Sequence, residues 1–238
     1  MRLLTLLFCA FSCFGQMMQA IVGQMVAAAA STPVVQVCNN TYSGDTSFAC
    51  VLTAGVASGH LAVVVGMGYN PTGAMTVNTD PRGNAYTSDQ HYPATPGGKY
   101  VVILHSVVST ALQPGDTITL VVNGNANYGV AIYDLQPPAA APVDVGNAAA
   151  GAYALTWTLT AGNTTASDIC VNAWFATTYD TPMTVDATWN ALPAITGISY
   201  LITQPSWKQV AASSSSSNTI TLAGYDDGSG VTQCYKKP

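Results

Sequence analysis

Short apolar runs that alternate with polar residues recur along the chain after residue 31. They are rich in Val, Ile, Thr and Tyr, and each ends at Gly, Pro, Asn or Asp. In the run YALTWTLTA, alternation puts Tyr153, Leu155, Trp157 and Leu159 on one face, with Ala and Thr on the other. A period of two places one row of side chains in a core and the other towards solvent. The pattern therefore predicts many short, half-buried β-strands.

The segments between these runs carry the chemistry of tight turns. Pro and Gly occur together in residues 80–84 (DPRGN) and 113–116 (QPGD), as tight turns require. No segment after residue 31 shows a helical period, and the chain contains no Glu, a residue that favours helices. We therefore predict an all-β protein, an antiparallel β-sandwich of the Ig-like or jelly-roll type.

Three pairs of segments resemble each other in the same order along the chain, which indicates two related halves. The pairs are 52–65 with 159–174, 75–87 with 183–196, and 117–137 with 219–238. The repeat is too long for a solenoid. The predicted organisation is a signal peptide in 1–30, a β-sandwich unit in 31–137, a Pro/Ala/Gly-rich linker in 138–151 and a second β-sandwich unit in 152–238. The pattern leaves open whether the units are two beads or one fused sandwich.

Residues 1–30 have the composition of a secretory signal helix. The positively charged residue Arg2 near the N-terminus is followed by an uncharged apolar stretch. Small residues then follow, which suit cleavage after Ala28 or Ala30. Two alternatives stay open: a retained membrane or filament helix, and a lipoprotein signal with Cys13 as the lipidated residue. Contact with a membrane is expected only through this segment.

The charge balance narrows the classes of partner. Of 238 residues, 7% are charged and 49% are hydrophobic, and the formal net charge is −5. This balance is the opposite of the one that produces disorder. Few, scattered cations on an acidic chain make a poor phosphate-binding surface. We therefore expect a folded protein that does not bind nucleic acid.

Four cysteines remain beyond the signal segment, and they predict two disulfides in an extracellular or cell-surface protein. Their spacing fits no zinc site. In the repeat, Cys170 and Cys234 fall on an early strand and on the last strand of one unit, so a bridge between them would close that unit. We therefore predict the pairs Cys38–Cys50 and Cys170–Cys234.

Residues 75–90 (MTVNTDPRGNAYTSDQ), with YVVILHSVV, LQPGDTITLVV and GVAIYDLQ after them, form a motif pattern. It resembles the pattern of secreted or surface β-sandwich proteins of bacteria and phages. In those proteins a strand ends in a D-x-x-G-N-x-Y/W-T turn, and a G-D-T-I-T strand follows. The resemblance extends over most of residues 50–238, with the second half as a degenerate repeat. It implies an extracellular Ig-like or jelly-roll module and carries over no catalytic residue.

The titratable residues do not form a recognisable catalytic pattern. The histidines are His60, His91 and His105, and no G-x-S-x-G nucleophile motif is present. Nearly every aspartate lies in a predicted turn, where it usually caps its own backbone. We therefore predict that the protein is not an enzyme.

Two further patterns suggest binding sites. Asp226 and Asp227 in YDDGSG offer adjacent oxygen ligands for Ca²⁺, although a simple hairpin tip is the favoured interpretation and no other cofactor is expected. Trp189 and Trp207 lie beside turn residues and are expected to be exposed, as in a carbohydrate-binding surface. Trp157 is expected in the core, and Trp174 shares a face with Cys170.

The leading hypothesis is a non-catalytic, extracellular structural or adhesive protein, as a self-assembling surface or filament subunit. A surface of Thr, Ser, Asn and Ala suits close packing against other copies, and residues 31–37 (STPVVQV) could add a strand to a neighbour. The alternative is a carbohydrate-binding module that uses exposed tryptophans, and the third hypothesis is a secreted hydrolase. The expected partners are other copies of the chain or extracellular glycans.

Overall fold

The computed structural model describes residues 33–44, 46–69, 73–92, 98–123, 127–136, 138–177, 183–196 and 201–238. The predicted signal segment, residues 1–30, lies outside the described residues. The described part is all-β, as predicted, with fifteen strands. They are β1 (Val34–Ser43), β2 (Ser47–Val51), β3 (Leu61–Tyr69), β4 (Met75–Thr79), β5 (Thr87–Tyr92), β6 (Lys99–Val107), β7 (Thr117–Val122), β8 (Asn127–Leu135), β9 (Val143–Asn163), β10 (Asp168–Ala176), β11 (Thr184–Val185), β12 (Asn190–Ala191), β13 (Ile195–Thr196), β14 (Ile202–Val210) and β15 (Ser215–Lys236).

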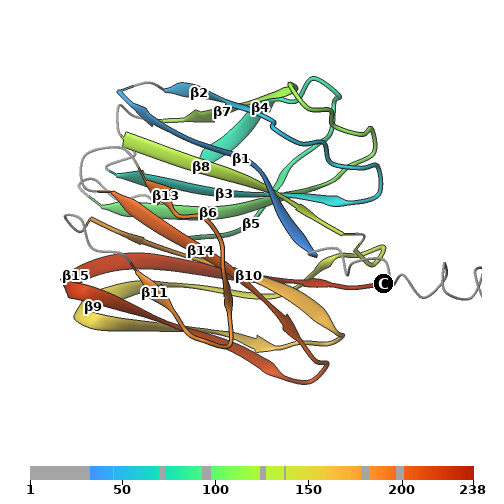
Figure 1. Ribbon diagram of the computed structural model, residues 1–238. Coiled ribbons are helices and arrows are strands. Elements are labelled where there is room, and N and C mark those ends of the chain that lie inside the picture. The colour runs from blue at the N-terminus through green and yellow to red at the C-terminus, as the bar shows by residue number, and fades with distance from the viewer. Residues whose placement is uncertain are drawn as a thin grey trace, which may run out of the picture. The chain divides into compact units, whose positions relative to one another are not determined.

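The first half is a sandwich of two antiparallel sheets. One sheet has the order β1-β8-β3-β6-β5 and the other has the order β2-β7-β4 (Figure 1). The pairing of the first strand with the last, and of the second with the next to last, is the winding of a jelly roll. Of the two predicted sandwich types, the strand order therefore favours the jelly roll.

The second half repeats this order, with the two long strands β9 and β15 in place of four strands. β15 pairs with β10, β10 pairs with β14, and β14 pairs with the short β12 and β13. β9 pairs along nearly the whole of β15. β9 thus takes the places of β1 and β2, and β15 takes the places of β7 and β8. The strand order agrees with the repeat seen in the sequence.

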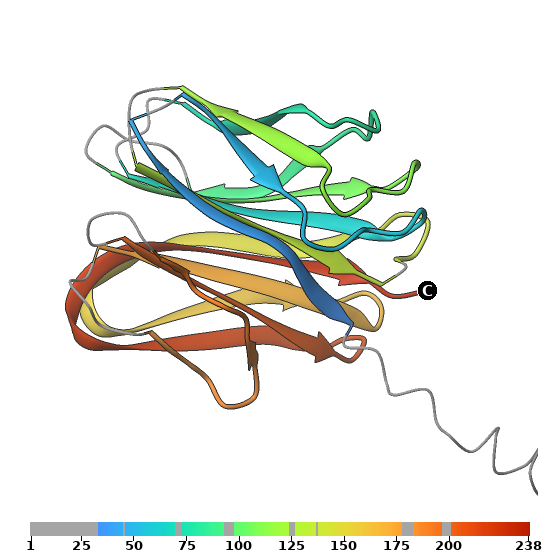
Figure 2. The ribbon, with the colours of Figure 1, turned by 45° about the horizontal axis from the view of Figure 1, so that its top comes forward.

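The long strands β9 and β15 bend so that they serve both layers of the second half (Figure 2). The pairing register shifts around Asp226, between Thr221 and Gly228. On one side of the bend β15 pairs with β10, and on the other it pairs with β11. Residues 143–151, which their composition assigned to a linker, belong to β9 and pair with β15. Their small side chains let this part of β9 pair closely with β15.

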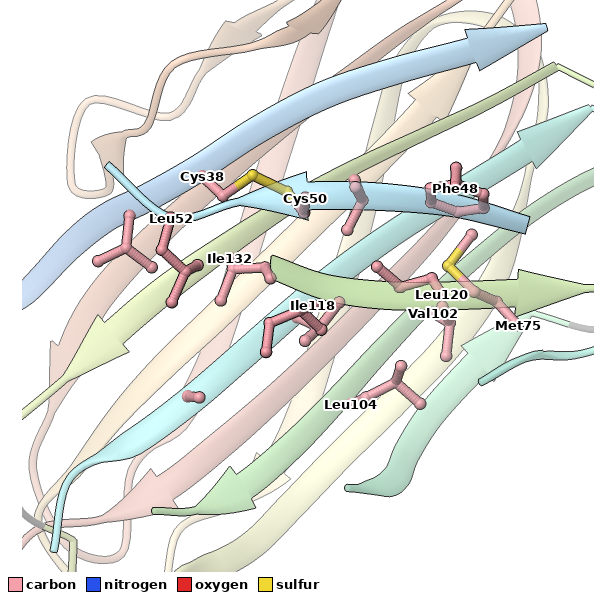
Figure 3. Packing of buried hydrophobic residues seen from close by; sticks show 14 of the residues in the cluster. Cys38, Phe48, Cys50, Leu52, Met75, Val102, Leu104, Ile118, Leu120 and Ile132 are labelled. Atoms are coloured by element: carbon pink, nitrogen blue, oxygen red, sulfur yellow. A yellow bond between two sulfur atoms is a disulfide. The ribbon is translucent and has the colours of Figure 1, made fainter. Parts of the chain in front are cut away.

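The core of the first half lies between its two sheets. Figure 3 shows Cys50, Ile118 and Leu120 of the outer sheet facing Ile132 and Val102 of the inner sheet. All five side chains are buried. This is the inward row that period-two alternation predicts for β2 and β7.

A second apolar core joins the two halves. Val63 and Ile103 from the inner sheet of the first half pack in one cluster with Val171, Phe175 and Val231 from the second half. Residues 34–238 form one compact unit. The halves are therefore fused through their inner sheets, and four layers of strands result.

β10 belongs to both cores of the second half because its side chains alternate. Its odd-numbered residues face the first half, whereas Trp174 packs on the other side with Trp157 and Ile220. The Trp157 and Trp174 ring centroids are 5.3 Å apart. The prediction that Trp157 belongs to the core is confirmed.

Both predicted disulfides are present. Cys38–Cys50 links β1 to β2, and Cys170–Cys234 links directly opposed residues of β10 and β15. Each bridge therefore lies within one half. Disulfides of this kind are typical of proteins from oxidising compartments.

The prediction that residues 31–37 form a strand on a neighbouring copy is not supported for its described part. Val34 begins β1, which pairs with β8 of the same chain along its whole length. The apolar residues Val34 and Val37 are buried there, so the segment completes the inner sheet of its own chain. Among the described residues, no helix is both long and apolar enough to cross a membrane.

Candidate functional site

The outer layer of the second half presents a regular face of hydroxyl groups. We call this the threonine face; it consists of Thr156, Thr158, Thr160, Ser217, Thr219 and Thr221. The three residues from β9 stand directly opposite the three from β15. The Oγ1 atoms of Thr158 and Thr219 lie 2.8 Å apart, and Thr160 Oγ1 donates to Ser217 Oγ at 3.0 Å. β11 extends the face with the exposed Thr184, which pairs with Thr221.

The opposite outer face belongs to β2, β4 and β7 and is also uncharged. Its outward residues include Ser47, Val51, Thr76 and Thr119. The sequences of β2, β4, β7, β11, of residues 154–163 in β9 and of residues 215–224 in β15 contain no Asp, Lys, Arg or His. These strand segments thus form two faces without charged side chains, the neutral outer faces, one on each outer layer (Figure 1). Asp186, directly after β11, lies at the margin of the threonine face, where its backbone N–H donates to the Thr219 carbonyl at 3.0 Å.

An exposed aromatic pair lies at the bend of the β9–β15 ribbon. Tyr153 and Tyr225 are 73% and 62% exposed, and their rings stack with centroids 5.6 Å apart. Leu155 is also partly exposed, at 38%. The sequence pattern placed Tyr153 and Leu155 on the core face with Trp157; this is wrong because the strand bends before it reaches Trp157.

The tryptophans that were expected to be exposed lie elsewhere. Trp189 is 5% exposed, packs in one cluster with the Cys170–Cys234 disulfide, and donates its indole N–H to the Ser217 carbonyl at 2.8 Å. Trp207 is half-buried against the core that joins the halves. A turn beside Trp189 suggested exposure, but the turn folds over the disulfide. Neither residue therefore forms an open aromatic platform.

Asp226 and Asp227 face a lysine from the other half. Lys99 Nζ, at the start of β6, lies 3.2 Å from Asp226 Oδ1 and 2.6 Å from Asp227 Oδ1, and it also donates to the Asp227 carbonyl. Its hydrogen bond to Asp227 is the main cause that lowers the pKa of this carboxyl group. The Lys99 ammonium group thus occupies the position beside both carboxylates where a bound Ca²⁺ ion would lie. The geometry therefore does not support the calcium hypothesis.

His105 belongs to a polar cluster buried between the halves. His105 Nδ1 lies 2.7 Å from Asp89 Oδ1, and Tyr235 donates its hydroxyl to Asp89 Oδ2 at 2.6 Å. Burial first, and then the Asp89 charge, raise the pKa of Tyr235 well above its usual value, so Tyr235 stays a donor. The cluster joins β5 and β6 of the first half to β15 of the second.

The other two histidines lie apart from this cluster. His60, directly before β3, has its Nδ1 atom 2.8 Å from Asp134 Oδ1 in the neighbouring strand β8. Burial is the main cause that raises the pKa of Asp134. His91 is exposed in β5. The structure therefore does not bring the three histidines together.

A carboxyl pair lies where β9 and β10 start. Asp168 is fully buried, and burial, with the nearby Asp144, raises its pKa to about 7. Asp144 accepts hydrogen bonds from Thr165 N at 2.6 Å and from Thr165 Oγ1 at 2.8 Å. Asp144 therefore fixes the turn before β10, a role that turn aspartates commonly have.

The D-x-x-G-N-x-Y turn that carries the family resemblance is structural. Asp80 Oδ1 accepts from Arg82 N at 2.7 Å, and Tyr86 donates to Asp80 Oδ2 at 3.1 Å. Asn84 Oδ1 accepts from the backbone of Ser109 at 2.9 Å and of Thr110 at 3.0 Å. Gly83 has a φ of 75°, which suits glycine best. Through these hydrogen bonds, the motif holds the turn at residues 80–84 against the turn at Ser109 and Thr110.

Sequence reasoning missed the Tyr153–Tyr225 pair and the threonine face. The signal for the face was present, because Thr156, Thr158 and Thr160 alternate with apolar residues. In the part of the chain that the structure describes, no three His, Cys or Asp side chains are grouped to hold a metal ion.

The chain was also compared with known proteins. The comparison finds no matching family model, no matching curated protein and no matching solved structure. The resemblance to secreted and surface β-sandwich proteins therefore stays a prediction.

Proposed function

We propose that this chain is a non-catalytic, extracellular structural or adhesive protein that assembles with copies of itself through its two neutral outer faces. The observation that carries the proposal is the absence of charged residues from the strand segments that form both faces. Interface cores are depleted in charged residues, and burying an unpaired charge is costly. A neutral face with paired hydroxyl groups avoids that cost.

The position of the two faces supports an extended assembly. One belongs to β2, β4 and β7, and the other to the outer parts of β9 and β15, so the two inner sheets lie between them. A contact between different faces of successive copies, unlike a two-fold contact, generates a filament when the rotation between copies does not close into a ring.

A structural role also agrees with the partners of the polar side chains. His105 and Tyr235 meet at Asp89, and Lys99 meets Asp226. The contacts Tyr235–Asp89 and Lys99–Asp226 each join one half to the other, so these groups hold the fold together. The two disulfides favour an oxidising, extracellular location.

Sedimentation velocity at increasing concentration tests the proposal. We expect wild-type protein to form species larger than a monomer, and the variant Thr158→Lys/Thr221→Lys to remain monomeric because it places two charges on the threonine face. Ala212→Lys, which places a charge in an exposed turn outside this face, is the control and should assemble normally. A wild type that stays monomeric at high concentration would contradict the proposal.

A second candidate function is carbohydrate binding at Tyr153 and Tyr225. Two exposed, stacked aromatic rings offer a hydrophobic surface to a sugar ring. We expect Tyr153→Ala/Tyr225→Ala to abolish binding on a glycan array, whereas Tyr69→Ala, a less exposed tyrosine elsewhere, should not change it. An array on which wild-type protein binds no glycan would remove this candidate.

A further inference from the structure

Lys99 is the buried cation at the junction of the two halves. Its side chain is only 9% exposed and that of Asp226 is 11% exposed, whereas Asp227 is 68% exposed. A buried primary amine thus lies against one buried carboxyl group, with a second, more open carboxylate beside it. An amine and a carboxyl group held at this range are positioned for reaction as well as for ion pairing.

We propose that Lys99 and Asp226 form an intramolecular amide bond between Lys99 Nζ and Asp226 Cγ. The bond would be a covalent modification that joins β6 of the first half to β15 of the second. This inference does not depend on the proposed assembly.

The reaction is a condensation that balances without an oxidant or any other reactant. The Lys99 ammonium passes one proton through Asp227 to Asp226 Oδ1, and the free amine then attacks Asp226 Cγ. A new C–N bond forms, and the bond from Cγ to Oδ1 breaks. A second proton from nitrogen, again carried by Asp227, completes a water molecule as the leaving group.

The surrounding contacts suit these roles. Thr177 donates its backbone N–H to Asp226 Oδ2 at 2.8 Å, where negative charge would develop in the tetrahedral intermediate. Asp227 N donates to Asp226 Oδ1 at 2.8 Å, which fixes the oxygen that leaves. Asp227 Oδ1 is within hydrogen-bond range of Lys99 Nζ, as a proton carrier must be.

The bond would supply a link that the disulfides do not. Cys38–Cys50 lies within the first half, and Cys170–Cys234 lies within the second. Between the halves, the described structure has the connecting chain, the shared core and polar contacts such as His105–Asp89–Tyr235. An amide from Lys99 to Asp226 would hold the halves together even when the shared core opens.

Peptide mapping of the full-length wild-type protein after reduction and trypsin digestion tests the proposal. If Lys99 is free, trypsin cuts after it and gives the fragments 83–99, 100–208 and 209–236. We expect instead a branched species that joins 83–208 to 209–236 and is lighter than their sum by one water. Free fragment 83–99 in full yield, without the branched species, would overturn the proposal.

Two controls keep the result specific. Lys236 Nζ lies 3.9 Å from Asp144 Oδ1 in an ordinary ion pair, so trypsin should still cut after Lys236. Lys99→Arg keeps the charge but should give no branched species. Asp227→Asn should leave the Lys99–Asp226 contact but reduce the branched fraction at least tenfold; an unchanged fraction would overturn the role of Asp227 as proton carrier.

Discussion

At the scale of single residues, buried polar side chains connect parts of the chain that are distant in sequence. Asn84 reaches Ser109 and Thr110, and Asp89 reaches Tyr235. Such groups are costly to bury without partners. Their removal should therefore destabilise the fold more than the loss of an exposed polar residue.

Asn84→Ala should lower the free energy of unfolding by about 2–4 kcal/mol, because it leaves the backbone N–H groups of Ser109 and Thr110 without an acceptor. Asn78→Ala, at an exposed position in β4, is the control and should cost less than about 0.5 kcal/mol. Urea unfolding curves measure both values. Equal losses in the two variants would contradict this account of the turn.

Asp168 should make stability depend on pH. Its pKa rises from the usual 3.8 to about 7 in the folded protein, so the native state binds a proton more tightly than the unfolded chain. The free energy of unfolding should therefore fall as the pH rises from 4 to 7. Asp168→Asn should remove this decline, so the variant should be more stable than wild type at pH 8 and similar to it at pH 4. Urea midpoints at the two pH values test this; a variant less stable than wild type at pH 8 would contradict it.

The sequence predicted some residue environments and not others. Both disulfide pairs and the burial of Trp157 followed from the repeat and from alternation. The burial of Trp189 was not predicted, because a neighbouring turn does not show what that turn covers. The partners of Asp226 and Asp227 were also beyond prediction, since Lys99 lies more than a hundred residues away in sequence.

At the scale of elements, the bend of β9 and β15 sets the shape of the second half. Gly151 and Gly228 stand opposite each other at the bend, and the Trp157 ring packs against both. A side chain at either position would meet this ring. The glycines therefore let the ribbon fold back onto its own core.

Gly228→Ala should lower the free energy of unfolding by about 1–3 kcal/mol because of this overpacking. A methyl group there would lie 2.4 Å from Trp157 and 2.5 Å from the Phe175 carbonyl oxygen. Gly224→Ala, four residues away in the same strand, has no atom within 4 Å of the added carbon and is the control. Thermal unfolding compares the two, and equal melting temperatures would be inconsistent with close packing at Gly228.

Strand positions were largely predictable, whereas the continuity of strands was not. The runs that became β3, β6, β7, β8 and β10 are visible as alternating or apolar segments. The composition of residues 143–151 resembled a linker because Ala and Gly are poor strand formers. Pairing with β15 overrode that preference.

At the scale of the whole molecule, the shared core should make the two halves unfold together. All four tryptophans lie in the second half, so their fluorescence reports on that half, whereas far-ultraviolet circular dichroism reports on both. We expect the two signals to change at the same urea concentration. Two separate transitions would show that the core between the halves contributes little.

The duplicated organisation was visible in the sequence, but the way the halves meet was not. Strands of the inner and of the outer sheets of a sandwich both show alternating patterns. Alternation alone therefore does not show whether another sheet covers the outward face of a strand. All nine residues of β10 are buried, as expected for a strand that is covered on both faces.

The proposed function requires that copies of the protein contact each other through the neutral outer faces. Electron cryomicroscopy of the assembled, purified protein tests it most directly, because the density shows which surface each copy buries. We predict that Thr158 and Thr219 on the threonine face of one copy contact the exposed residues of β2 and β4 of the next copy. Contacts made only through strand edges or turns, with both outer faces open to solvent, would contradict the claim.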